Sequence, residues 1–254
     1  SPSSAASDVY KRQGLSPAAC HYVLKMGLGQ DAVSAAMISC AVKGHLQIDQ
    51  SGKKDYQITR LTAPDQSQAL SPGEHRLLSN LLNVGQTIEL DNEHHRRFQK
   101  AQAALSEALA KEYHKKLFHK NVGYWAKGVG LSVLTLVVTA ILGPSPVVII
   151  TALILAVLMA IVFYRLLKAP TREGRRVMDK IEGFKMYLGT AEKDRLERMK
   201  GPELTPEVFE MFLPYAFALG VGNTWCERFE NRLRAMQRDP NDYHPSWYHG
   251  SSLR

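Results

Sequence analysis

The feature that most constrains this chain is an uncharged stretch of 37 residues, 128–164, which contains no Asp, Glu, Lys, Arg or His. A single helix of that length would be about 55 Å long, almost twice the ~30 Å hydrocarbon core of a bilayer. Residues 143–146, Gly-Pro-Ser-Pro, interrupt the stretch, and two prolines with a glycine end a helix and turn the chain. The pattern therefore predicts a two-helix transmembrane hairpin over 124–164, with spans at 124–142 and 147–164.

Basic residues flank this hairpin on both sides. Five lysines precede it within 111–127, six Lys or Arg residues follow it within 165–180, and the turn carries no charge. The positive-inside rule then predicts that both flanks are cytoplasmic, and basic residues beside the hairpin favour anionic lipids. A buried hairpin in a soluble core is the alternative. The residues expected at the membrane interface are Tyr124, Trp125, Lys127, Tyr164, Arg165 and Lys168.

Residues 14–62 predict two helices followed by two strands. Ser16 followed by Pro17 is typical of a helix N-terminus, and Asp31 is expected to cap the second helix. Two alternating segments then flank a glycine turn, which is typical of a β-hairpin. This order predicts a small winged-helix-like α+β module.

A winged-helix-like module raises the hypothesis of DNA binding, which the charges argue against. Residues 14–65 contain five basic and four acidic side chains, a balance of only +1, although the whole chain carries +8. A DNA reader needs Lys or Arg for phosphates and long polar side chains for base edges. We therefore expect no nucleic-acid partner and keep a membrane-tethered DNA-binding regulator as the alternative.

The remaining segments are predicted more coarsely. Residues 1–13 resemble a translated sequencing adapter, with a natural disordered terminus as the alternative, and are set aside from fold reasoning. Residues 63–120 predict a short helix, a strand and a long amphipathic helix over 91–117. Residues 165–240 predict a cytoplasmic helical domain, in which Pro214 implies a kink or break, and residues 241–254 are a tail.

No motif for catalysis or for a cofactor occurs in the sequence. The three cysteines are isolated, which rules out a disulfide framework and a Cys-based zinc site. The histidines of 94–119 lack ligands at metal spacing and are better explained as a solvated helix face. No phosphate-binding loop or nucleophile elbow is present. We therefore expect no catalytic residue, no cofactor and no metal site.

Two blocks after the hairpin resemble a known family. The first is Ile-Glu-Gly-Phe-Lys-Met-Tyr-Leu at 181–188 with Thr-Ala-Glu-Lys-Asp-Arg at 190–195, and the second is Leu-Pro-Tyr-Ala-Phe-Ala-Leu-Gly at 213–220 with the aromatic residues that follow. Both are similar to the YciQ-like family of predicted bacterial membrane proteins, a domain of unknown function. The family-motif residues, expected mainly to pack, are Glu182, Gly183, Phe184, Tyr187, Leu188, Phe209, Leu213, Pro214, Tyr215, Trp225 and Phe229.

The resemblance covers nearly all of residues 15–230 and implies the C-terminal portion of a longer bacterial inner-membrane protein. It carries over no activity. The sequence thus predicts a mainly α membrane protein that consists of the module, the transmembrane hairpin and the helical domain. Its expected role is a non-enzymatic scaffold or signalling partner that contacts the lipid bilayer and an unidentified protein, with self-association left open.

Overall fold

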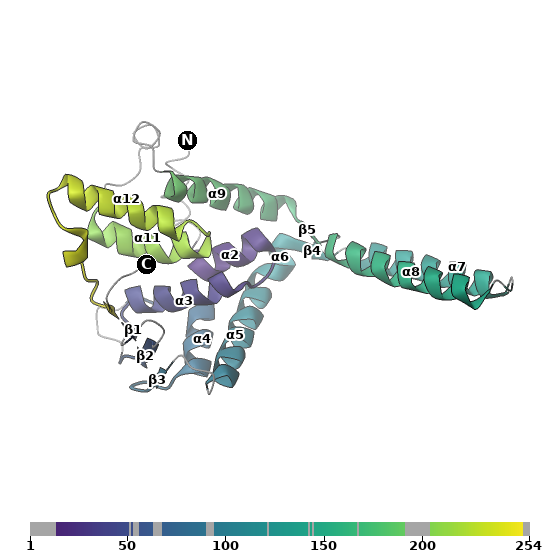
Figure 1. Ribbon diagram of the computed structural model, residues 1–254, viewed down its shortest axis with the longest axis horizontal. Coiled ribbons are helices and arrows are strands. Elements are labelled where there is room, and N and C mark those ends of the chain that lie inside the picture. Colours follow the sequence, from purple (N-terminus) through teal and green to yellow (C-terminus); the bar gives the residue numbers. More distant parts are fainter. Residues whose placement is uncertain are drawn as a thin grey trace. The chain divides into compact units, whose positions relative to one another are not determined.

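The computed structural model describes residues 14–50, 52, 56–62, 68–89, 94–120, 122–141, 143, 145–166, 168–190 and 204–250 (Figure 1). Residues 1–113 with 176–254 form one compact unit, here called the core unit, and residues 114–175 form a second, the arm. Expectations for 1–13, for the hairpin turn at 51 and 53–55, for the motif at 191–195 and for the last residues, 251–254, lie outside the described residues. In the described part, the chain is mostly helical with a small mixed sheet.

The core unit begins with α2 (Pro17–Lys25) and α3 (Gln30–Val42). Ser16 caps α2 as predicted, because its Oγ accepts a hydrogen bond from the backbone N–H of Ala19 at 3.3 Å. The cap of α3 is Gly29, and Asp31 lies in the first turn instead. A Cβ at Gly29 would lie 2.5 Å from Nε2 of the buried His21, so close packing of the two helices requires glycine there.

Four strands form one sheet in the order β3-β2-β1-β6. The predicted hairpin is present as β1 (Leu46–Gln50) and β2 (Tyr56–Arg60), which pair antiparallel with Ile48 opposite Ile58. β3 (Thr87–Glu89) extends the sheet beside β2. On the other side, β6 (Tyr248–His249) pairs parallel with β1, so the sheet joins strands that are about 200 residues apart in the sequence.

Helices α4 (Pro72–Leu81) and α5 (His95–Leu109) pack against each other beside this sheet. Gly73 permits the close approach, because a Cβ there would lie 3.0 Å from Cδ1 of Leu105. The predicted long helix does not continue as one α-helix to residue 117. After α5 the chain forms a π-helical turn, η1 (Ala110–His114), and a short α6 (Lys115–Leu117).

The C-terminal helices are α9 (Arg172–Gly189), α11 (Pro206–Ala218) and α12 (Gly222–Ala235), followed by the 3-10 turn η2 (Pro240–Asp242). Pro214 lies inside α11, which continues through it. α11 packs against α2 and α3. The Tyr215 hydroxyl donates to the Leu15 carbonyl at 3.0 Å, and His21 Nδ1 lies 2.7 Å from the Ala218 carbonyl oxygen. Helices from both ends of the chain therefore share one core.

The arm is a helical hairpin of α7 (Val122–Ile141) and α8 (Pro146–Leu166). The two helices pack against each other, and Trp125 Nε1 donates to the carbonyl of Ala160 at 3.0 Å. At the base, β4 (Phe118–Lys120) pairs antiparallel with β5 (Lys168–Pro170). The chain therefore enters and leaves the hairpin through one short ladder.

The predicted two-helix transmembrane hairpin is wrong. Among the residues that the structure describes, no helix combines the length and the apolarity needed to cross a membrane. The predicted spans, 124–142 and 147–164, follow from the lack of charge over 128–164 and from the turn that interrupts it. A span must meet that requirement within one helix, and the absence of charge over the whole run does not supply it.

Candidate functional site

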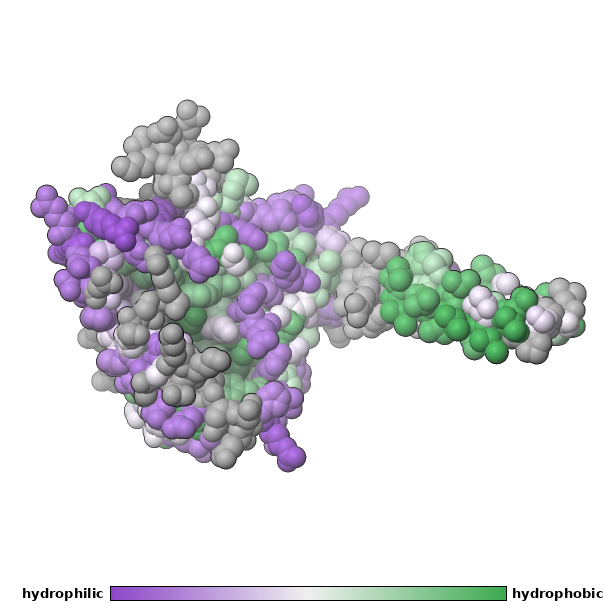
Figure 2. Space-filling model, in the orientation of Figure 1, coloured by the Kyte–Doolittle hydropathy of each residue, from purple (hydrophilic) through white to green (hydrophobic). Residues whose placement is uncertain are grey.

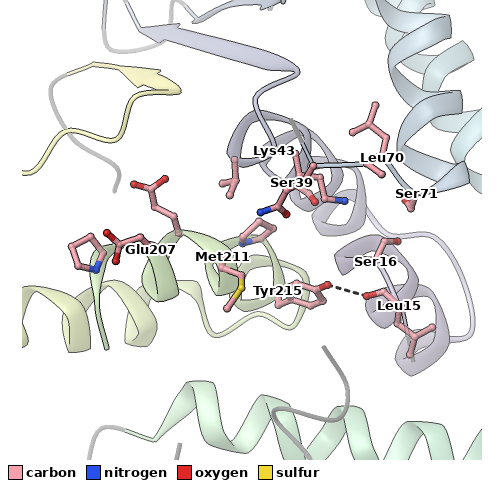
Figure 3. A pocket seen from close by; sticks show the side chains of 16 residues that line it. Leu15, Ser16, Ser39, Lys43, Leu70, Ser71, Glu207, Met211 and Tyr215 are labelled. Carbon is pink, nitrogen blue, oxygen red and sulfur yellow. Dashed lines mark hydrogen bonds between the residues drawn. The ribbon is translucent and has the colours of Figure 1, made fainter. Parts of the chain in front are cut away.

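The candidate site in the core unit is a groove of about 650 Å³ (Figure 3). Ser39 of α3 and Lys43, the C-cap of α3, lie on one side of it, and Glu207, Met211 and other residues of α11 lie on the other. Leu15, Ser16 and the segment before α4 complete the lining, which mixes polar and apolar side chains. Its volume lies in the range of pockets that hold small ligands.

A buried carboxylate stabilises the α3 side of the groove. Glu74 is fully buried, and its Oε1 accepts a hydrogen bond from Ser39 Oγ at 2.6 Å. Its Oε2 lies 2.6 Å from Lys43 Nζ and accepts from the backbone N–H of Ser71 at 2.7 Å. A buried charge is tolerated when an ion pair and hydrogen bonds replace its water. This network ties α3 to the start of α4 and fixes the groove wall.

A second carboxylate, Glu210, organises the α11 side. It accepts hydrogen bonds from the Tyr243 hydroxyl and, at 3.0 Å, from Trp247 Nε1. Burial and then the hydrogen bond to Glu210 raise the pKa of Tyr243, so its hydroxyl remains a donor at neutral pH. Glu207, one turn earlier, is exposed, and a hydrogen bond involving Thr205 lowers the pKa of its carboxyl group.

The groove chemistry is suited to binding by shape and hydrogen bonding. Within the described ranges, no group of three or more His, Cys, Asp or Glu side chains is placed to hold a metal ion. All three cysteines are buried. Burial raises the pKa of the Cys20 thiol to about 12 and raises that of Cys40 well above its ordinary value. Neither thiol is therefore ionised at neutral pH, whereas a cysteine nucleophile must be a thiolate.

The arm carries a different kind of surface. Its large apolar side chains are widely exposed, with Leu131 at 66%, Ile141 at 78% and Val147 at 71% of their possible accessible area. Figure 2 shows hydrophobic residues gathered along α7 and α8, whereas hydrophilic residues dominate the visible face of the core unit. A cleft of about 400 Å³ between the two helices is lined almost entirely by apolar residues. Contiguous apolar surface of this extent marks a site of association.

The structure places two of the six residues predicted at the membrane interface. Trp125 is half-buried against α8 through its hydrogen bond to Ala160, and Lys127 is exposed. The side chains of the other four lie outside the described residues. They are Tyr124, Tyr164, Arg165 and Lys168.

The family-motif residues form an aromatic cluster between α9, α11 and α12. Phe209 stacks on Phe229 with ring centroids 4.0 Å apart. Trp225 is fully buried, and its Nε1 donates to the Phe209 carbonyl at 3.2 Å. The guanidinium of Arg228 lies 5.1 Å from the ring centroids of both Tyr187 and Trp225. The other buried members are Phe184, Leu188, Leu213, Pro214 and Tyr215, whereas Gly183 is half-buried and Glu182 is exposed.

Most of this cluster packs away from the groove, and only Pro214 and Tyr215 among the motif residues line it. Sequence reasoning missed the two carboxylates that organise the groove. A local signal for Glu74 is present, because Ser71-x-x-Glu74 is a capping box that the structure contains in full. Glu210 has no local signal, since its two donors lie 33 and 37 residues further along the chain.

The helix that the DNA-binding alternative relies on is largely occupied by packing. α3 contacts α2 and α11, and its buried residues include Ala35, Ala36 and Cys40. Its exposed positions are Gln30, Asp31 and Ser34, none of which is basic.

A mostly helical core unit with an exposed apolar hairpin defines a protein with a large apolar association surface. Residues 8–229 match the family described as "predicted membrane protein (DUF2207) C-terminal domain", and the chain belongs to that family. The description assigns no activity. Neither a curated protein nor a solved structure matches the chain. The match confirms the predicted membership of a family of predicted membrane proteins. The YciQ-like name and the place in a longer chain stay predictions.

Proposed function

We propose that this protein is a non-enzymatic interaction protein that associates with the bacterial inner membrane through its arm and holds its core unit at the cytoplasmic face. The observation that carries this proposal is the exposed apolar surface of α7 and α8. Family membership supports the membrane association. The groove of the core unit supports a binding role, because its carboxylates are held by hydrogen bonds that shape its walls.

The energetics favour transfer of this surface out of water. Eighteen large apolar side chains on α7 and α8 are exposed among the described residues, each at about half of its possible area or more. Complete burial of one such side chain is worth about 1.5–3 kcal/mol, so burial of half is worth roughly 1 kcal/mol. Together these side chains favour an apolar environment by on the order of 10–20 kcal/mol, before entropy is counted. Such a surface is a strong association signal.

The base of the arm supports the proposed side of the membrane. The β4–β5 ladder joins the entering and leaving strands, with Phe118 opposite Pro170, so both ends of the hairpin lie on the same side of the arm. Basic residues surround these ends within 111–127 and 165–180. Such residues favour the cytoplasmic side and contribute about 1 kcal/mol each near anionic lipid.

Vesicle flotation of the full chain tests the membrane association. The vesicles contain phosphatidylcholine alone or with phosphatidylglycerol. Wild-type protein is expected to float with both, and more completely with the anionic vesicles. A triple variant of exposed arm residues, Leu134→Glu, Leu155→Glu and Leu158→Glu, is expected to stay in the bottom fraction. Val84→Glu is the matched control, because Val84 is an exposed apolar residue of the core unit.

Circular dichroism accompanies the flotation, to show that the core unit of each variant remains folded. A triple variant that floats as well as wild type would contradict the proposal. The side of the membrane is tested separately in cells, with reporter fusions after Asn121 and after Lys180. Both positions are expected to report the cytoplasm, and opposite signals would overturn the proposed side.

A further inference from the structure

The segment after α12 binds back onto the core unit, although it lies beyond the residues matched by the family. The match ends at residue 229, whereas the C-terminal strap, defined here as residues 239–250, is fixed by contacts to α11, α12 and β1. Figure 1 shows this end of the chain running from α12 toward β1. Every partner of the strap that we describe therefore belongs to the family-matched part of the chain.

The first anchor of the strap is Glu210. Its carboxylate accepts from both Tyr243 and Trp247, two donors four residues apart in the strap. The Tyr243 ring packs edge-on against Phe229, with ring centroids 4.9 Å apart, and against Phe209 at 6.1 Å. A single carboxylate beside an aromatic wall thus selects two aromatic donors at a fixed spacing.

The second anchor is the edge of β1. β6 adds to this edge as a short parallel strand, and the backbone N–H of Ile48 donates to the Trp247 carbonyl at 2.9 Å. Two side-chain contacts flank the pairing: Tyr248 donates to Gln50 Oε1 at 2.5 Å, and His249 Nδ1 lies 3.1 Å from Asp49 Oδ1. Without the strap, β1 would be the open edge of the sheet order β3-β2-β1. Open strand edges accept extended peptides by adding a strand.

We propose that the β1 edge, Glu210 and the aromatic wall of Phe209 and Phe229 form a peptide-docking site, which the strap occupies in cis. The partner that it fits is an extended peptide with a tyrosine followed four residues later by Trp-Tyr, the pattern of Tyr243, Trp247 and Tyr248. The strap then acts as a built-in competitor. This inference rests on the strap contacts and does not depend on association with a membrane.

Two features make the strap exchangeable. Among the described residues, its strand pairing extends over two residues of β6, so most of its described attachment comes from side chains that a partner peptide can reproduce. The connection to α12 runs through residues 234–239, all of which are exposed, with Met236 at 46%. The joint between α12 and the strap is therefore thinly packed, which suits displacement of the strap as a unit.

The experiment cuts the covalent connection between α12 and the strap and leaves the strap sequence in the sample. A protease recognition sequence is inserted after Arg238 in the full chain, the protein is cleaved, and a fluorescein-labelled peptide with the sequence of residues 239–250 is added. Fluorescence anisotropy is expected to show saturable binding to the cleaved protein and little binding to the uncut protein. Glu210→Ala in the cleaved protein is expected to weaken binding by about tenfold or more, because hydrogen bonds to a charged group are lost.

Glu227→Ala, a change at an exposed glutamate of α12, is the matched control and should leave binding unchanged. Labelled peptides with Tyr243→Phe or Trp247→Phe should bind more weakly. Absence of saturable binding, or equal binding to cut and uncut protein, would overturn the proposal. If cleavage unfolds the chain, the uncut Tyr243→Phe, Trp247→Phe double variant decides the question. That variant should bind the wild-type peptide better than the wild-type chain does, and equal binding would again overturn it.

Discussion

Replacement of Trp225 by alanine should be among the most destabilising single changes in the core unit. The side chain is fully buried and lies between Phe209, Phe212 and Tyr187, with ring centroids at 6.3, 6.1 and 6.4 Å. Truncation of a buried tryptophan costs about 3–5 kcal/mol. The lost hydrogen bond from Nε1 to the Phe209 carbonyl accounts for about 1 kcal/mol of stability. We expect a total near 4–5 kcal/mol.

Thermal unfolding of the full chain in detergent, followed by circular dichroism, measures this loss. For a unit of this size, 1 kcal/mol corresponds to about 2–4 °C, so Trp225→Ala should lower Tm by about 8–20 °C. Trp225→Phe keeps an aromatic ring but loses the hydrogen bond, and it should cost about 1–2 kcal/mol. Trp125→Ala removes an indole from the arm and serves as the control for the core unit.

If Trp225→Ala lowers Tm by less than about 4 °C, the packing argument is refuted. If that variant also lost a protein partner, the aromatic cluster would have to be treated as a binding surface.

Three further changes test other parts of the core unit. Glu74→Gln leaves the half-buried Lys43 ammonium beside a neutral amide, and it should cost about 2–4 kcal/mol in urea unfolding; a cost no larger than that of the exposed control Glu107→Gln would refute the role of the network. Gly29→Ala should cost about 1–3 kcal/mol because its Cβ would lie 2.5 Å from His21 Nε2. Gly27→Ala, whose Cβ would have its nearest neighbour at 4.0 Å, should cost less, and equal costs would contradict the steric argument. Burial raises the pKa of Cys20 to about 12 from an ordinary value of 9.0. The protonated thiol therefore contributes fully to the stability of the fold below pH 9, and this contribution is lost as the pH rises toward 12. Between pH 9 and 12 the free energy of unfolding should fall by about 1.4 kcal/mol per pH unit, and it should fall less steeply in Cys20→Ala. Identical pH profiles of the two proteins would refute the role of Cys20.

Local signals in the sequence predicted local structure well. Ser16-Pro17 marked the start of α2, and the two alternating segments around the glycine turn correspond to β1 and β2. A capping interaction or a period of two is determined by residues that are neighbours in the chain, so it is visible without the fold. Pro214 does not break α11, which continues through it, and the kink stays a prediction.

The parts that could not be predicted depend on contacts between distant residues. Nothing near Glu210 indicates that Tyr243 and Trp247 will bond to it, and nothing near Ile48 indicates that β6 will pair with β1. The groove therefore could not be located from sequence, although Ser39 and Lys43 are spaced one helical turn apart. The transmembrane prediction failed for another reason: it rested on the absence of charge, which does not by itself establish that a helix is long and apolar enough to cross a membrane.

The position of the arm in the chain has a consequence for the order of events during synthesis. The core unit needs α11 to cover α2 and α3, yet the arm is translated between them. About 40 residues separate the end of α8 at Leu166 from the start of α11 at Pro206, which takes about 2–8 s at 5–20 residues per second. The apolar hairpin therefore leaves the ribosome seconds before the core can close. A circular permutant that begins at residue 176 would reverse this sequence and complete the core before the hairpin is made.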